Sequence, residues 1–137
     1  MPDGLYLKLA NVQELLPVCM AGDGVRRFIN IVSSIANEDY RMLLIDELDN
    51  GLHHTAHKKL WKAILQFVTK RDIQLFATTH NIDCLQGLMA TLAEDIKLRP
   101  LANVYDIART ARNGFRAYKY SYNGLKESFA RNLEIRE

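Results

Sequence analysis

The residues from Arg41 to His54, RMLLIDELDNGLHH, decide the fold that this sequence predicts. Within them, Met42–Ile45 is an unbroken apolar run that stops at two adjacent carboxylates, Asp46 and Glu47. Continuous hydrophobicity without alternation is typical of a strand that is covered on both faces, as in a parallel α/β sheet. Ligands of such sheets bind outside the carboxyl ends of the strands, so the two acids are predicted to face a ligand.

Asp46 and Glu47 are expected to act differently, because neighbouring side chains leave a strand in opposite directions. One carboxylate could hold a hydrated Mg²⁺, which keeps several waters and takes only one or two protein carboxylates beside nucleotide oxygens. The other could reach a water molecule in front of a phosphate. The alternative for this stretch is a core strand that happens to end in an acidic turn.

A second apolar strand, predicted over Ile73–Thr78, ends at the polar residues Thr79–Asn81. An amphipathic helix over Thr55–Thr69 separates it from the first strand, and this strand–helix–strand order predicts two parallel neighbours. Because such strands end at the same sheet edge, His80 is expected beside the two acids. There it could donate a hydrogen bond to a terminal phosphate, whereas the alternative is a buried, hydrogen-bonded histidine without a chemical role.

A glycine-rich turn, Ala21–Gly24, precedes a strongly periodic segment that predicts a helix over Val25–Ala36. The same period places Arg26, Arg27 and Asn30 on the polar side of this helix. A glycine turn that opens a helix presents free backbone N–H groups and the positive end of the helix dipole, which suits a phosphate. The alternative is a plain glycine turn in which Asp23 caps the helix.

The remaining pattern completes an α/β fold with one domain, residues 1–137, because no repeat, low-complexity segment or linker divides the chain. The other expected elements are a strand over Leu5–Leu9, an apolar connection over Val12–Met20, a helix over Ile82–Leu92, strands over Val104–Arg109 and Phe115–Tyr122 joined by a hairpin at Asn113-Gly114, and a helix over Asn123–Leu133.

The composition is that of an ordinary globular protein, with 48% apolar and 25% charged residues among 137. A net charge of +2 is too small to indicate nucleic acid or membrane by itself. From Lys97 onward the chain has nine basic residues and four acidic ones, and this excess of positive charge indicates either a polyanion-facing surface or a solvated face. No secretory segment or membrane span is evident, and the two cysteines lack metal spacing, so a cytoplasmic protein with reduced thiols is expected.

The sequence gives little support to two other chemistries, zinc binding and covalent catalysis. His53 and His57 are four residues apart, like a helical pair of zinc ligands, but no glutamate base lies between them and no third ligand is evident. A metal-dependent hydrolase is therefore the least favoured alternative. No Ser-His-Asp or Cys-His arrangement stands out, and no GxxxxGK[ST] loop occurs, so the part that would cradle a β-phosphate is missing from these residues.

Three segments, AGDGVRR, MLLIDELDNGLHH and IQLFATTHNIDCL, together resemble the second half of an ABC-type ATPase head. The resemblance is closest to the AAA-like and OLD-like ATP-binding proteins of prokaryotes and more distant to SMC heads. It runs from about Met20 to Leu85, with the motifs in the family's order and spacing. It implies a partial P-loop-NTPase sheet of parallel strands with flanking helices, then a C-terminal β-hairpin and short helix. The implied parts are a lead-in over 1–20, a core over 21–99 and a tail over 100–137.

The resemblance also implies a role for each matching residue. Asp46 would be the Walker B acid that holds Mg²⁺ through water, Glu47 the general base and His80 the switch histidine. The positions implied to bind nucleotide are Gly22, Asp23 and Gly24 in the signature turn, and Asp49, Asn50 and His53 in the D-loop that crosses a dimer interface. Two residues depart from the family pattern: Gly22 stands where serine is usual, and His54 replaces a common proline.

The implied function is that of the C-terminal part of an ATP hydrolase that works with Mg²⁺ in a head-to-tail dimer. Its P-loop would come from a missing N-terminal half or from a second copy. The rival interpretation is a nucleotide-free module that docks a partner, such as a nuclease or DNA, through its basic tail. Reading the coding sequence upstream for GxxxxGK[ST] would discriminate between them.

Overall fold

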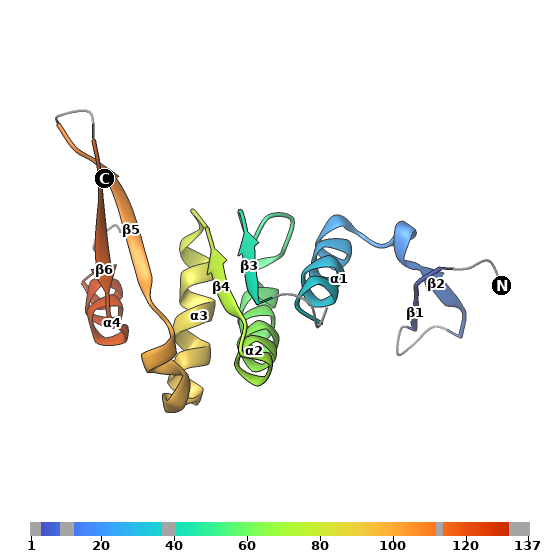
Figure 1. Ribbon diagram of the computed structural model, residues 1–137. Coiled ribbons are helices and arrows are strands. Elements are labelled where there is room, and N and C mark those ends of the chain that lie inside the picture. The colour runs from blue at the N-terminus through green and yellow to red at the C-terminus, as the bar shows by residue number, and fades with distance from the viewer. Residues whose placement is uncertain (1–3, 9–12, 37–40, 112–113, 132–137) are drawn as a thin grey trace. The chain divides into compact units, whose positions relative to one another are not determined.

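The structure is a computed structural model that describes residues 4–8, 13–36, 41–111 and 114–131 (Figure 1). Its packing divides the chain into two compact units, residues 1–87 and 88–137, and each is described by itself. The boundary falls within helix α3 (Ile82–Glu94) rather than near residue 100. The organisation as one domain stays a prediction.

In its described residues, the first unit contains two small sheets and four helical segments. Its elements are β1 (Tyr6–Lys8), β2 (Leu15–Pro17), the 3-10 helix η1 (Val18–Met20), α1 (Asp23–Ala36), β3 (Met42–Ile45), α2 (His54–Arg71), β4 (Gln74–Ala77) and the first turns of α3. The bounds of β3 are those predicted. The pairing of β1 with β2 was not predicted, because a three-residue Leu-Leu-Pro strand carries no alternation to read.

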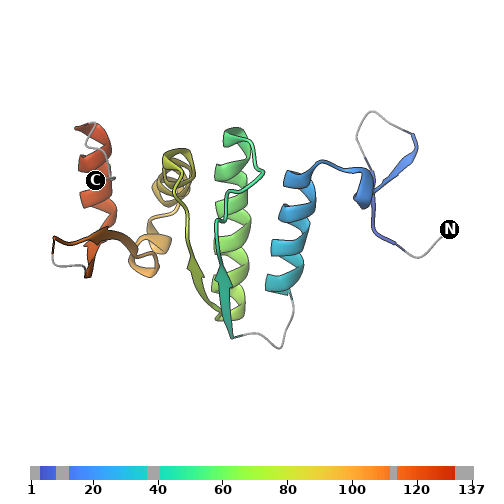
Figure 2. The ribbon, with the colours of Figure 1, turned by 90° about the horizontal axis from the view of Figure 1, so that it is seen from above.

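Strands β3 and β4 pair in parallel, with Met42 opposite Gln74 and Ile45 opposite Ala77, so the predicted parallel neighbours are confirmed. Helix α2, which connects them in sequence, runs alongside both strands (Figures 1 and 2). Parallel pairing brings the two carboxyl ends to the same edge, where the polar residues follow.

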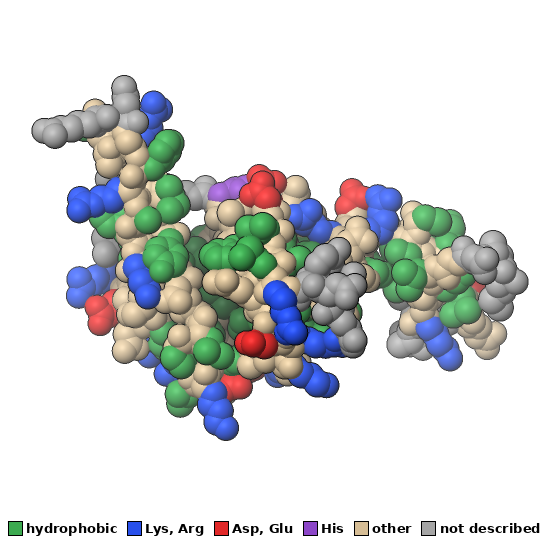
Figure 3. Space-filling model, in the orientation of Figure 1, with side chains coloured by type: hydrophobic (Ala, Val, Ile, Leu, Met, Phe, Trp, Pro, Cys, Tyr) green, Lys and Arg blue, Asp and Glu red, His purple; other side chains and the backbone are tan. Residues whose placement is uncertain are grey.

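The prediction that this sheet is covered on both faces is wrong for the described residues. Leu43 and Ile45 are half-buried, whereas Met42 and Leu44 are 54% and 73% exposed. Phe76, which pairs with Leu44, is 49% exposed on the same face. Figure 3 shows apolar side chains gathered over these two strands. Alternation along a strand separates its two faces, and only one of them is covered here.

The core of the first unit forms around α2. Leu60, Trp61 and Ile64 are buried as the helical period predicts, and so is His57, which was not expected there. The Trp61 indole donates a hydrogen bond of 2.9 Å to the Cys84 carbonyl and thereby ties α2 to the start of α3. A β-carbon on Gly87 would lie 2.8 Å from the His57 β-carbon, so glycine permits the close approach of these helices.

The second unit contains the rest of α3, the 3-10 helix η2 (Ile96–Leu101), strands β5 (Val104–Arg109) and β6 (Phe115–Tyr120), and helix α4 (Tyr122–Ala130). The antiparallel hairpin of β5 and β6 is confirmed, and the Ser121 hydroxyl caps α4 by accepting a 3.2 Å hydrogen bond from Gly124 N–H. Asn113 of the predicted turn and Leu133 of the predicted last helix lie outside the described residues. Of the helices described, none has the length and hydropathy to cross a membrane.

Candidate functional site

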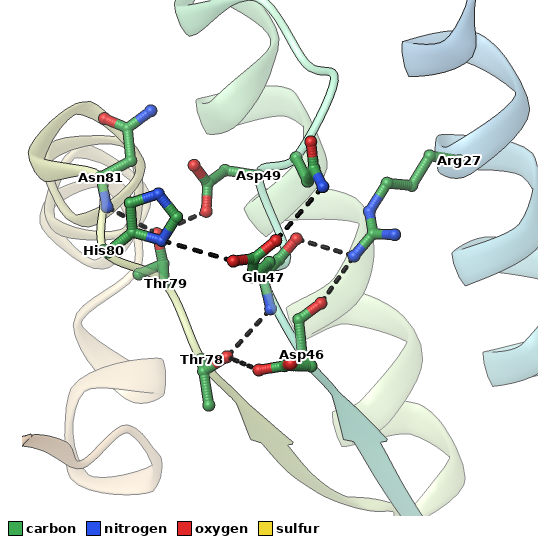
Figure 4. A network of polar contacts seen from close by, with 9 residues as sticks. Arg27, Asp46, Glu47, Asp49, Thr78, Thr79, His80 and Asn81 are labelled. Atoms are coloured by element: carbon green, nitrogen blue, oxygen red, sulfur yellow. Dashed lines mark hydrogen bonds and ion pairs between the residues drawn. The ribbon is translucent and has the colours of Figure 1, made fainter.

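The segment that follows β3 is joined by backbone hydrogen bonds to the end of β4. We call Asp46–His53 the acidic turn and Ala21–Gly24 the glycine turn. Thr78 N–H donates to the Ile45 carbonyl, and Leu48 N–H donates to the Thr78 carbonyl, both at 2.9 Å. These bonds continue the parallel pairing past the strands and fix the acidic turn beside Thr78 and His80 (Figure 4).

Glu47 lies at the centre of this network. Its carboxylate accepts a 3.2 Å hydrogen bond from the Asn50 amide and lies 3.8 Å from Nδ1 of His80. The expected proximity of His80 to the acid pair is therefore confirmed. The Glu47 backbone has φ 48°, a left-handed conformation that non-glycine residues rarely adopt. Its N–H donates to the Thr78 hydroxyl oxygen at 2.9 Å, which supports this conformation.

Thr78 also contacts the other acid. Its hydroxyl donates a hydrogen bond to the Asp46 carboxylate while accepting the one from Glu47 N–H. One hydroxyl thus orients both acids, and Asp46 remains exposed at the strand end. From the sequence, Thr78 is predicted only as the last residue of a strand. Its position opposite Asp46 follows from the strand register, which the sequence did not specify.

Arg27 of α1 reaches the same place from a different element. Its Nη2 donates to the carbonyl oxygens of Asp46 and Glu47 at 2.6 and 2.7 Å. Its Nε is buried and has no hydrogen-bond partner among the described residues. The helical period had placed Arg27 on the polar side with Arg26 and Asn30. That prediction missed its contact with the acidic turn, because a long side chain can reach a neighbour from the edge of a helical face.

The glycine turn opens α1, but Asp23 does not cap the helix. Asp23 is the first helical residue, and its carboxylate accepts a hydrogen bond from Arg26 one turn later. The Gly22 carbonyl accepts from Val25 and Arg26 N–H groups at 3.0 and 3.2 Å. A β-carbon on Gly22 would meet nothing within 4 Å.

Gly24 has a different environment from Gly22. A β-carbon on Gly24 would lie 2.4 Å from the Gly51 carbonyl oxygen, so only glycine fits without a shift of the backbone. Gly51 itself has φ 76° in the acidic turn. The two predicted nucleotide-binding segments therefore touch through their glycines.

A cavity of about 630 Å³ lies between α1, β3 and the acidic turn. Its polar lining includes Asp23, Arg26, Arg27, Asn30, Asp46 and Asn50. Residues from both predicted segments therefore border one space.

Asp49 is an internal anchor of the acidic turn, with 7% of its surface exposed. The Thr79 hydroxyl donates to its carboxylate. Burial raises the pKa of Asp49, but hydrogen bonds from Thr79, the Asp49 backbone and Asn81, together with the His57 imidazole, lower it more. The net pKa lies below the ordinary value, so this carboxylate is ionised at neutral pH.

The other predicted D-loop residues have separate roles in the structure. Asn50 is exposed and contacts Glu47, as described above. His53 caps α2, its ring accepting from Thr55 N–H at 3.5 Å and lying 4.1 Å from the His54 ring. A cap at this position fixes where the acidic turn ends.

The zinc alternative has no support in the structure. His57 is 1% exposed, and neither of its ring nitrogens has a hydrogen-bond partner among the described residues. In the part of the chain that the structure describes, no three His, Cys, Asp or Glu side chains are grouped as metal ligands would be. His53 meanwhile serves as a helix cap.

Comparisons with known proteins agree with the resemblance found in the motifs. Residues 11–83 match the family described as "AAA domain, putative AbiEii toxin, Type IV TA system". An "ATP/GTP phosphatase" of Helicobacter pylori (strain ATCC 700392 / 26695) is 30% identical over 93 residues, which are 66% of this chain and 25% of that protein. The chain thus spans about a quarter of the length of this curated relative.

A solved structure shares the fold. It comes from work on the structural biochemistry of ATP-driven dimerization and DNA-stimulated activation of SMC ATPases. The TM-score is 0.61 with 10% sequence identity, over 94% of this chain and 71% of that one. At this identity the likeness shows an α/β fold similar to that of an SMC ATPase. The match of residues 11–83 covers more than half of the chain and includes the glycine turn, the acidic turn and His80, so the protein belongs to this AAA-domain family of ATPase-type proteins.

Proposed function

We propose that this chain is the C-terminal part of a protein that binds ATP and hydrolyses it with Mg²⁺ in a head-to-tail dimer. The observation that carries the proposal is the grouping of Asp46, Glu47 and His80 at the carboxyl ends of two parallel neighbours. The H. pylori relative is named an ATP/GTP phosphatase, and the SMC study concerns ATP-driven dimerization, and both are consistent with it.

Asp46 is the residue that would hold Mg²⁺. Its carboxylate is exposed at the strand end beside the Thr78 hydroxyl, and such hard oxygen donors suit this ion, which is bound through one or two carboxylates and water. When bound, Mg²⁺ would neutralise charge on the phosphate oxygens. Thr78 keeps the carboxylate in a fixed orientation for this task.

Glu47 is the proposed general base. It would take a proton from a water molecule whose oxygen attacks the γ-phosphorus in line, as the bond to the ADP oxygen breaks. His80, 3.8 Å from the Glu47 carboxylate, would donate a hydrogen bond to the γ-phosphate and so orient the water between them. Catalysis of this kind consists mostly of positioning and charge stabilisation.

The remaining predicted residues would act across a dimer. The glycine turn, with Gly22, Asp23 and Gly24, would contact the γ-phosphate bound by a second copy. Asp49, Asn50 and His53 would shape the D-loop at the interface. Since these 137 residues contain no GxxxxGK[ST], the P-loop must come from outside them. The organisation of residues 21–99 as the core, after a lead-in over 1–20 and before a tail over 100–137, belongs to this proposal.

The test is Glu47→Gln in the full-length gene product. Removing a general base lowers turnover by about a hundredfold or more, whereas the amide keeps the shape of the side chain. We expect steady-state ATP hydrolysis to fall by that factor and the affinity for ATP, measured by fluorescent-nucleotide titration, to stay nearly unchanged. Glu127→Gln, at an exposed position of α4, is the matched control and keeps full turnover. Unchanged hydrolysis in Glu47→Gln would overturn the assignment.

A second candidate function is a DNA-binding module that has lost nucleotide chemistry. The hairpin of β5 and β6 favours it, because one face exposes Tyr105 and Phe115 together with Lys119. Aromatic rings and cations on one sheet face suit the bases and phosphates of a single strand. The two candidates separate on whether GxxxxGK[ST] is encoded upstream and on whether the protein is retained on DNA in a salt-dependent manner.

A further inference from the structure

We infer that Arg27 is a positioning residue that connects the glycine turn to the catalytic carboxylate of Glu47. This inference rests on the proposed function and deepens it by naming how one part of the site controls another. Arg27 lies on α1 four residues after Asp23, and its guanidinium reaches across to the acidic turn (Figure 4). Its hydrogen bonds to described residues go to the backbone of that turn and not to a carboxylate.

The contact is strong and specific in its geometry. One nitrogen of Arg27 donates to two consecutive carbonyl oxygens, those of Asp46 and Glu47, at 2.6 and 2.7 Å. Hydrogen bonds from a charged donor are shorter and stronger than neutral ones. Because both acceptors are carbonyls, the guanidinium fixes the orientation of two successive peptide planes. A lysine would offer a compact ammonium on a flexible stem in place of the planar guanidinium, so it would hold the two carbonyls less firmly.

The two peptide planes that Arg27 contacts flank Glu47, whose backbone conformation is unfavourable. Glu47 has φ 48°, which an L-residue with a long side chain adopts only when its surroundings impose it. Thr78 holds the N–H side of Glu47 and Arg27 holds its carbonyl side. Without Arg27 one side of this support is lost, and the Glu47 backbone is free to relax toward an ordinary conformation. The carboxylate would then move away from the water that it is proposed to activate.

The helix that carries Arg27 begins at the glycine turn. Asp23 and Arg27 are one helical turn apart, so a displacement of the helix start moves both together. Gly24 already lies against Gly51 of the acidic turn, which gives a second contact between the same two segments. When the glycine turn contacts a phosphate bound by a second copy, α1 would shift, and Arg27 would pass this shift to the backbone of Glu47. In this way hydrolysis would require a closed pair of copies.

The test compares Arg27→Gln and Arg27→Lys in the full-length gene product, with Lys59→Gln on the exposed side of α2 as the control of equal charge change. Misplacing a catalytic group by about 1 Å can cost on the order of a hundredfold in rate. We expect Arg27→Gln to lower kcat by about ten- to a hundredfold while KM for ATP and ATP-dependent pairing, followed by light scattering, stay near the wild-type values. We expect Arg27→Lys to have a kcat between those of Arg27→Gln and the wild type. We expect Lys59→Gln to keep the wild-type kcat.

The outcomes separate the inference from the function beneath it. An unchanged kcat in Arg27→Gln would overturn the inference, and so would a parallel loss of kcat, pairing and thermal midpoint, which indicates a merely structural arginine. Glu47→Gln is measured beside it. If Glu47→Gln loses turnover but Arg27→Gln does not, only the coupling fails; if Glu47→Gln retains turnover, the proposed function itself fails.

Discussion

Glu47 and Asp49 lie two residues apart in the acidic turn, yet they differ in solvent exposure and in backbone conformation. Glu47 is exposed and holds a left-handed backbone conformation, which costs on the order of 1–3 kcal/mol. Asp49 is buried and satisfied by hydrogen bonds that keep it ionised. If Glu47 is the general base, as proposed, a strained backbone at that residue needs a rigid neighbour to sustain it. Asp49 supplies that rigidity by joining the acidic turn to Thr79.

The lowered pKa of Asp49 leads to a pH-dependent prediction for Thr79→Val. A carboxyl whose folded-state pKa lies below its unfolded value stabilises the fold fully above about pH 4, and this contribution is lost as pH falls further. Valine removes the donor to Asp49, so the folded-state pKa rises toward the ordinary value. We expect Thr79→Val to lower the free energy of unfolding by about 1–3 kcal/mol at pH 7 and by less at pH 3, measured by urea denaturation.

Thr79→Ser is the matched control, because it keeps the hydroxyl and should keep most of the pH-dependent stability. Part of the loss in Thr79→Val is independent of pH, since the same hydroxyl accepts from Asn81 N–H at 3.0 Å. A destabilisation of equal size at both pH values would therefore show that the charge of Asp49 contributes nothing, contrary to this account.

At the residue scale, the sequence predicts the site residues that directly follow a strand, such as Glu47 and His80. It does not predict the contacts that Thr78 and Arg27 make with the acidic turn. The proximity of His80 to Glu47 follows from a general rule for parallel strands, so the sequence alone predicts it. Thr78 and Arg27 could not be assigned in this way. The role of Thr78 depends on strand register, and Arg27 was placed with the solvent-facing polar residues by a helical period that says nothing of how far a guanidinium extends.

At the scale of elements, the clarity of the residue pattern decided what could be predicted. Strands β3 and β5 have the bounds that the sequence indicated, because each is a clean run with a clear end. Strand β2 was missed, since three residues that include a proline give no periodic signal. The 3-10 helix η2 was missed as well, because its Pro100 reads as a break.

The two glycines of the glycine turn lead to opposite predictions for substitution by serine. The resemblance to ABC-type ATPase heads implies a serine at the position of Gly22, and a β-carbon there meets nothing within 4 Å. We expect Gly22→Ser to fold normally and to lower KM for ATP or strengthen ATP-dependent pairing by about threefold to tenfold, as one added hydrogen bond would. Steady-state hydrolysis and light scattering at graded ATP concentrations measure this.

Gly24→Ser serves as the comparison. Its β-carbon would collide with the Gly51 carbonyl oxygen, so the glycine turn and the acidic turn must separate. This variant should lose turnover, because the collision lies between the two segments that the site combines. If Gly22→Ser weakens pairing as Gly24→Ser does, the glycine turn does not face a phosphate in the assembled protein.

At the scale of the whole molecule, the sheet of β3 and β4 leaves one apolar face exposed. An apolar run such as Met42–Ile45 predicts cover on both faces, and the described residues supply it on one. The chain spans about a quarter of the length of its H. pylori relative, so in a protein of that size ample further sequence is available to cover the other face. The mismatch between pattern and burial is therefore informative: the apolar run of β3 is typical of a strand covered on both faces, and the described residues cover one face.

The exposed face predicts how these 137 residues behave when purified alone. Leu44 is 73% exposed and lies beside Phe76, so the isolated chain should self-associate through this face. Leu44→Gln removes apolar area worth about 1.5–3 kcal/mol when buried, which would weaken self-association about ten- to a hundredfold in sedimentation velocity. Ile96→Gln, at a position that is 68% exposed and outside any sheet, is the control and should change little. In a longer gene product whose further residues cover this face, the same Leu44→Gln should instead destabilise the fold by about 2–5 kcal/mol. A monodisperse wild-type fragment, or a full-length Leu44→Gln with unaltered stability, would show that this face needs no cover.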